Sequence, residues 1–337
     1  MYHHRDTQCV TVATHSEVVV STLLLVSVAA AARPALVGLA LAVVLVLVPR
    51  TRWPVMAIRP RIRRWIVAGA GLALLVTLAG ASLPLLPLLG IDLPEPLGFS
   101  DAAAAQRVGI LVPLVAGVLA VAVIALPAGG SGSTSGGSAA LSRRTPSAFV
   151  AHPWPAVVLV LVAAAAGLAV AAGLASSQDE QGRWAMYVVD MGSAAIGTTI
   201  YGWYASVPAL ILISVLIALA AAAIWRISRP PWGSDPVRDA SARRQRSHTV
   251  LAVAAGALLL HLSKVLASLS GTAAIRGTAH SGDQFFRGGA SFSALEEPLG
   301  VLSTGAAVSG WAIWGIVLLA CLVSPRLEAR GHATGAA

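Results

Sequence analysis

The chain has 337 residues, of which 57% are hydrophobic and 11% are charged, and its mean hydropathy is +0.79. A soluble domain cannot bury so much apolar surface, so the composition excludes a soluble protein and indicates one whose solvent is lipid. The net charge of +9 does not indicate a nucleic-acid partner, because the arginines cluster in short loops beside hydrophobic runs and no basic face interleaved with aromatic residues is present.

The hydrophobic runs are long and consist mainly of Ala, Val and Leu. Small residues of this kind suit closely packed transmembrane helices, whereas the strands of an outer-membrane barrel alternate polar and apolar residues. The sequence therefore predicts an all-α, polytopic integral membrane helix bundle.

The chain begins with a polar segment, residues 1–17, which we expect to be a cytoplasmic tail. Two apolar runs follow, 18–32 and 35–48, with Arg33 and Pro34 between them. A charge at the bilayer centre costs at least about 3 kcal/mol, so we expect a helical hairpin with Pro34 at its turn. A single kinked helix, or a signal peptide cleaved after the alanine run, is the alternative.

The first group of four spans covers residues 18–126, with its third and fourth spans at 65–88 and 107–126. Residues 49–64 hold six arginines, which predicts a cytoplasmic loop. Residues 127–153 include GGSGSTSGGS and are expected to form a flexible cytoplasmic linker. No phosphate-binding GxxxxGK[ST] pattern is present, so nucleotide binding there is not expected.

The second group of four spans covers residues 154–323. Its first span has small residues at Ala169 and Gly173, which predicts a helix at the centre of the bundle. Two long outside loops are expected at 176–204 and 271–300, and a cytoplasmic tail at 324–337. Within the first loop, residues 185–200 are too polar and glycine-rich to span, and are expected to lie on the membrane or dip into it. Its aromatic residues suit the interface belt: Trp184, Tyr187, Tyr201, Trp203 and Tyr204.

Charge counting supports eight spans with both termini in the cytoplasm. In that topology seventeen of the 23 basic residues lie inside, five lie outside and Lys264 lies within a span. Lys264 is the only lysine, a bias typical of GC-rich genomes, so we expect a bacterial plasma membrane. Cys9 and Cys321 both fall on the cytoplasmic side, so a disulfide is not expected.

One predicted span, 249–270, carries ionisable groups well inside its apolar run. His261, Lys264 and Ser268 lie three and seven residues apart, which places them in one polar stripe on a helix. An ionisable residue at membrane depth must face a partner or a water-filled cavity, so this stripe is the candidate site.

Three interpretations of Lys264 remain open. Its ammonium could extend to the outer headgroups, since it lies six residues, roughly 9 Å, from the predicted helix end. It could form a buried ion pair, for which Asp190 is the first candidate and Glu296 or Glu297 the next. It could also line a substrate or proton pathway. For His261, a hydrogen bond to a neighbouring helix is favoured over a proton relay.

The remaining motifs are weaker. Trp311 and Trp314 share one face of the last span, where packing with the indole N–H bonded to a backbone carbonyl is favoured over an aromatic substrate wall. His3, His4 and His15 lack acidic or cysteine partners at metal-ligand spacing, so no metal is expected. No HExxH, GxSxG or CxxC pattern occurs, so the sequence shows no catalytic constellation typical of hydrolases or redox enzymes, and no cofactor is expected.

Three functional hypotheses follow. The first is a transporter, or the permease-like membrane subunit of a transport complex. Without a nucleotide-binding site, it would depend on a separate cytoplasmic ATPase or on an ion gradient. The second is a non-catalytic scaffold or accessory subunit that packs against another membrane protein. The third is an enzyme acting on a lipid-linked substrate at the outer face, using acids from the outside loops.

Overall fold

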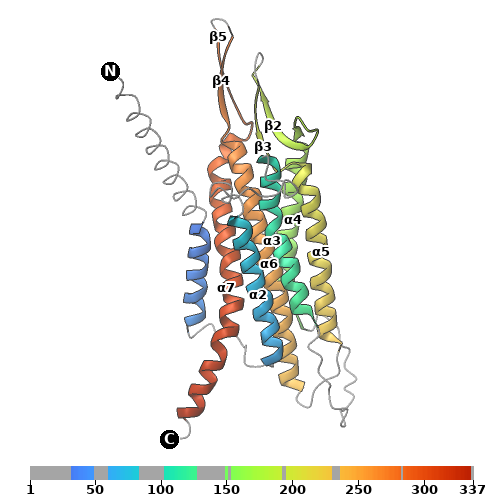
Figure 1. Cartoon of the computed structure of the whole chain (residues 1–337), viewed down its shortest axis with the longest axis vertical. Helices are drawn as coiled ribbons and strands as arrows, with labels where there is room; N and C mark the ends of the chain where they lie inside the picture. The colour runs from blue at the N-terminus through green and yellow to red at the C-terminus, as the bar shows by residue number, and fades with distance from the viewer. Residues whose placement is uncertain are drawn as a thin grey trace, which may run out of the picture.

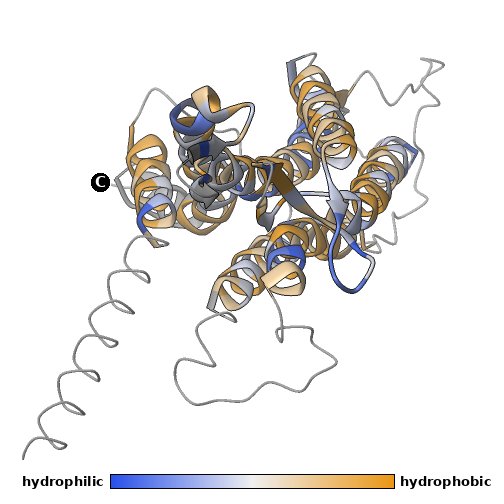
Figure 2. Ribbon diagram, turned by 90° about the horizontal axis from the view of Figure 1, so that it is seen from above, coloured by the Kyte–Doolittle hydropathy of each residue, from blue (hydrophilic) through white to orange (hydrophobic). Residues whose placement is uncertain are grey.

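Seven helices lie side by side in the part of the chain that the computed structural model describes, which comprises residues 32–48, 60–82, 102–126, 149–150, 153–191, 195–229, 236–281 and 284–334 (Figure 1). Six of them are long and apolar enough to cross a membrane, so the described helices are those of a multi-pass membrane protein. These six are α2 (Pro60–Ser82), α3 (Ala102–Ala125), α4 (Pro153–Leu174), α5 (Trp203–Ser228), α6 (Pro236–Ala273) and α7 (Glu296–Thr334). Seen from above, hydrophobic residues colour the helices on every side of the bundle (Figure 2).

The remaining helix, Ala32–Leu47, precedes α2 in the chain. It is shorter than the other six and packs beside α7. A methyl group added at Gly38 would lie 2.7 Å from Trp311 Cβ, so the two backbones approach closely through small residues. Arg33 and Pro34 belong to the first turn of this helix, so the predicted turn at Pro34 between two helices is wrong. Proline is tolerated in the first turn because backbone N–H groups there have no acceptor within the helix, so the missing N–H of Pro34 costs no hydrogen bond. Residues 18–31, which would form the first of eight spans, lie outside the described residues.

Helix α6 is the centre of the bundle. It contacts α3, α4, α5 and α7, and 78% of the residues in its most apolar stretch are buried, against 28% for α4 and for α5. The expectation that α4 would be central is wrong. Its small residues Ala169 and Gly173 are buried, the latter against Trp203, but one stripe of small residues makes only one interface and leaves the rest of the helix exposed.

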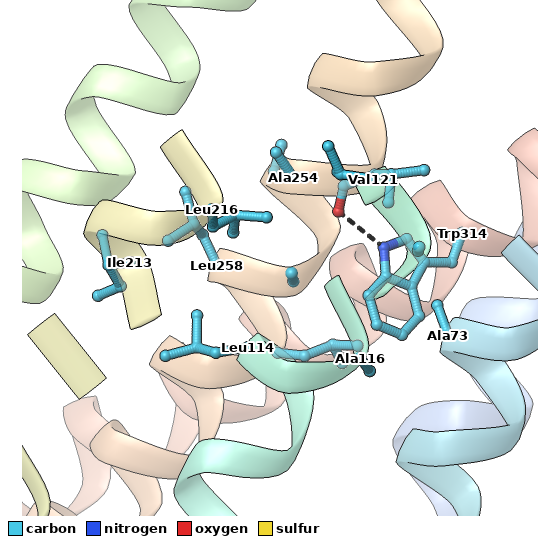
Figure 3. Packing of buried hydrophobic residues seen from close by; sticks show 14 of the residues in the cluster. Ala73, Leu114, Ala116, Val121, Ile213, Leu216, Ala254, Leu258 and Trp314 are labelled. Carbon is cyan, nitrogen blue, oxygen red and sulfur yellow. Dashed lines mark hydrogen bonds between the residues drawn. The ribbon is translucent and has the colours of Figure 1, made fainter. Parts of the chain in front are cut away.

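Helices α6 and α7 approach each other closely through glycines. Gly256 faces the indole of Trp314, and a methyl group at Gly310 would lie 2.7 Å from Leu260 Cγ. Trp314 is completely buried and its Nε1–H donates a hydrogen bond of 3.0 Å to the carbonyl of Val253 (Figure 3). This confirms packing, with the indole bonded to a backbone carbonyl, as the role of Trp314.

Helix α6 starts thirteen residues before the predicted span, inside the arginine-rich segment. Arg243 is buried and its guanidinium is 2.7 Å from Asp239 Oδ2, one turn earlier. The same guanidinium donates to the carbonyl oxygens of Ile227 and Ser228 at the end of α5. Arg243 thus links the start of α6 to the end of α5. These contacts stabilise the part of α6 that precedes its apolar stretch.

Two strand hairpins stand at one end of the bundle, the hairpin end (Figure 1). The first sheet has the antiparallel order β1 (Ser177–Gln178), β2 (Trp184–Asp190), β3 (Ala195–Thr199), and the second pairs β4 (Arg276–Ser281) with β5 (Gln284–Gly289). The expectation of a purely α-helical chain therefore holds for the bundle but misses these loops. The segment 185–200, expected to lie on the membrane or dip into it, instead belongs largely to the paired strands β2 and β3 above the helix ends, because alternating residues such as those of WAMYVVD suit a half-buried strand.

The turn before β2 is organised by Asp179. Its carboxylate accepts hydrogen bonds from the backbone N–H groups of Gln181 and Arg183, and it forms an ion pair of 2.7 Å with the Arg183 guanidinium. Partial desolvation raises the pKa of Asp179, but these hydrogen bonds outweigh it and hold the pKa below its ordinary value of 3.8.

The two hairpins contact each other at a glycine of β4, since a methyl group added at Gly277 would lie 2.7 Å from Ile196 Cδ1.

Candidate functional site

His261 lies in the middle of α6 and is completely buried. Its Nδ1 is 3.0 Å from the carbonyl oxygen of Ile110 on α3. A carbonyl can only accept, so Nδ1 carries the proton and Nε2 of the neutral ring is an acceptor. The hydrogen bond to a neighbouring helix that the sequence favoured is therefore present, and it turns Nε2 toward the other side of the imidazole.

Tyr201 reaches the same region from the segment between β3 and α5. Its ring is completely buried, and its centroid is 6.1 Å from that of His261 with an edge-to-face angle of 71°. The sequence predicted that Tyr201 belongs to the aromatic belt at the membrane interface. Its side chain is instead completely buried inside the protein. The hydroxyl of Tyr201 and Nε2 of His261 both lack a hydrogen-bond partner among the described residues, as does the hydroxyl of Ser206, five residues further on.

A second polar contact joins α6 to α3 two turns closer to the hairpin end. The amide nitrogen of Gln106 donates to the hydroxyl of Ser268. One turn further, the hydroxyl of Thr272 contacts the carbonyl of Thr199, at the end of β3. The α6 face that begins at His261 thus carries polar side chains at His261, Ser268 and Thr272, with the buried Val265 between the first two, and α3 and β3 cover it.

Lys264 does not share this covered face, because its residue is exposed. Helix α3 contacts α6 at His261, whereas α7 contacts it at Ser263, whose carbonyl accepts from Ser303 Oγ at 2.8 Å. At 100° per residue, the direction of Lys264 falls between these two contacts. Ala267 and Gly271, one and two turns further on, are exposed on the same side. Lys264 is therefore exposed on the side of α6 that lies between its contacts with α3 and α7.

The three acids proposed as counter-charges lie near the hairpin end. Glu296 forms an ion pair of 2.9 Å with Arg276. Glu297 is beside it in the first turn of α7, and Asp190 ends β2, opposite Ala195. Among the described residues Lys264 forms no ion pair. Pairing of Lys264 with one of these acids stays a prediction.

The Arg276–Glu296 pair borders an open pocket of about 470 Å³ on the second hairpin. Arg276, Thr278, Arg287 and Ser293 line it together with three glycines. In the described part of the chain no three His, Cys, Asp or Glu side chains come together as metal ligands would.

Sequence reasoning singled out His261 and Ser268, and it missed Tyr201, Gln106 and Ser206. Tyr201 belongs to an aromatic-rich loop whose composition is typical of a membrane interface, so nothing local distinguishes it from Tyr204. No family model, no curated protein and no solved structure matches the chain.

Proposed function

We propose that this chain is a transport protein, or the membrane subunit of a transport complex, in the plasma membrane of a bacterium. The observation that supports this function best is a set of two buried polar atoms on and beside the central helix, Tyr201 Oη and His261 Nε2, which have no hydrogen-bond partner among the described residues. Each buried polar group without a partner costs about 1–3 kcal/mol. Groups of this kind are retained where another state of the molecule, or a passing ion or water, satisfies them.

The proposed path follows α6. It begins at the hairpin end, passes Thr272 and the Gln106–Ser268 contact, and reaches His261 and Tyr201 at the centre of the bundle. In the proposed orientation the hairpin end is outside, because the arginine-rich segments lie toward the opposite end. Since no nucleotide-binding pattern occurs in the sequence, the energy would come from an ion gradient or from a separate ATPase subunit.

Purification in a mild detergent followed by reconstitution tests this proposal. A secondary transporter is expected to carry protons or a labelled solute into proteoliposomes loaded with a pH-sensitive dye. The membrane subunit of a complex is expected to retain a cytoplasmic ATPase during purification. Stable isolation without either result would contradict a transport function.

The position of Lys264 supports a second candidate, a non-catalytic scaffold or accessory subunit. A lysine exposed on a membrane helix is stabilised by an acidic side chain of another membrane protein. In this function a partner helix docks on the exposed side of α6 around Lys264, and the polar contacts of His261 and Ser268 are structural.

Labelling of Lys264 separates the two candidates, since it is the only lysine. A membrane-impermeant, amine-reactive reagent applied to intact cells is expected to leave the peptide that carries Lys264 unmodified if a partner helix covers it. The same peptide is expected to react after solubilisation and removal of the partner. Reaction to the same extent in cells and in detergent would contradict a covering partner and would favour extension of the ammonium to the headgroups.

A further inference from the structure

A groove of about 930 Å³ opens on the side of the bundle between α4 and α5, toward the end opposite the hairpins. Val158 and Leu159 form one wall, Ala221 and Trp225 form the other, and Leu251 of α6 forms the floor. Every one of these side chains is apolar apart from the indole N–H. The groove can therefore hold a flexible hydrocarbon but offers no polar group to a water-soluble ligand.

The groove faces the hydrocarbon of the bilayer. The helices that form its walls are the two least buried of the six long apolar helices. Their exposed residues include the large hydrophobic side chains of Leu159, Val160, Ile211 and Val215. Because lipid surrounds such helices, an acyl chain is the molecule that fills a furrow between them.

A positive charge stands at the mouth of the groove. The guanidinium of Arg229 lies 3.7 Å from the centroid of the Trp225 ring, which is itself part of the wall. Arg229 is exposed and forms no ion pair with a described acid, whereas the nearby Arg243 is buried and paired with Asp239. The charge of Arg229 is thus available for a ligand, and the stacked indole fixes its position.

We propose that the α4–α5 groove binds an anionic phospholipid, with an acyl chain along Val158, Ala221 and Leu251 and the headgroup phosphate on Arg229. An apolar furrow that ends in a fixed arginine matches the two halves of this ligand, and a neutral phospholipid would gain less from Arg229. In the proposed orientation of the chain this is the leaflet in which anionic lipids gather. The proposal requires only that the helices lie in a membrane, so it stands independently of the transport function.

Quenching of Trp225 by brominated lipid tests the proposal. The purified full-length protein is placed in vesicles of phosphatidylcholine containing phosphatidylglycerol, with dibrominated acyl chains on one lipid or on the other. The contribution of Trp225 is the difference between wild type and Trp225→Phe. At equal bromine content we expect quenching by brominated phosphatidylglycerol to exceed that by brominated phosphatidylcholine, corresponding to about fivefold preferential binding, because Arg229 attracts the net negative headgroup whereas the choline cation offsets the phosphate charge.

Three variants define the outcome. Arg229→Gln is expected to abolish the preference for phosphatidylglycerol, and Ala221→Phe, which fills the furrow, is expected to lower quenching by both lipids. Arg226→Gln is the matched control, because Arg226 is exposed on the same turn but points about 140° away from Ala221 and should leave the preference unchanged. Equal quenching by both lipids in wild type would overturn the proposal, as would equal losses in Arg226→Gln and Arg229→Gln. Absence of quenching by either lipid, together with a dimer in light scattering, would show that a second copy of the chain fills the groove.

Discussion

Replacement of Gly256 by leucine is expected to lower the free energy of unfolding by about 3 kcal/mol. A side chain at this position would collide with the indole of Trp314, because even a methyl group would overlap Nε1 and Cδ1. Trp314 is completely buried and cannot move without losing its hydrogen bond to Val253. The substitution is therefore expected to separate α6 from α7 at this position.

The measurement is unfolding by sodium dodecyl sulfate in mixed micelles, followed by tryptophan fluorescence. Gly256→Ala is expected to fall between wild type and Gly256→Leu, although alanine has the higher helix propensity, because the collision outweighs a gain of about 1 kcal/mol. Gly271→Leu is the matched control on the same helix, since nothing lies within 4 Å of its added methyl group, and it should change stability by less than about 0.5 kcal/mol. Equal effects at Gly256 and Gly271 would show that α6 and α7 are not in close contact there.

Removal of the unpartnered polar atoms is expected to reduce transport more than tenfold without loss of stability. Tyr201→Phe deletes a buried hydroxyl that has no partner among the described residues, and the pocket for the ring is retained. His261→Leu sacrifices the hydrogen bond to Ile110, worth about 1 kcal/mol, but it also removes an unsatisfied acceptor of similar or larger cost. Stability is therefore expected to be unchanged or higher in both variants, while the polar path is interrupted.

Dye-loaded proteoliposomes report the flux of each variant, and detergent unfolding reports its stability. Ser263→Ala is the control. The buried hydroxyl of Ser263 also lies on α6, but it donates within the helix, to the carbonyl of Leu260, and the substitution retains the backbone carbonyl that accepts from Ser303. It should leave flux unchanged. If Tyr201→Phe and His261→Leu both lower stability and preserve flux, the cluster is a structural one with an ordered water, and the transport proposal loses its main support.

Prediction from the sequence was most accurate for the spans. Helix α3 begins and ends within five residues of the span predicted at 107–126, and prolines at Pro60, Pro153 and Pro236 mark the starts of α2, α4 and α6. A hydrophobic run of some twenty residues must satisfy its backbone hydrogen bonds within itself when lipid surrounds it, so helix formation depends on local sequence alone. His261 and Ser268 could also be identified from the local sequence, because a polar residue inside such an apolar run has a high free-energy cost in lipid and is therefore rare.

The partners of those residues could be identified only from the tertiary structure. His261 bonds to Ile110, which is 151 residues away, and Tyr201 enters the bundle from a loop whose composition indicates a surface position. In lipid, hydrophobicity does not distinguish a core face from an outer face, so which helix is central depends on close packing of small side chains. For this reason α6, with its glycine opposite Trp314, occupies the centre and α4 does not. The helices follow from the chemistry of each segment, whereas the arrangement of polar groups along α6 follows from non-local contacts between segments.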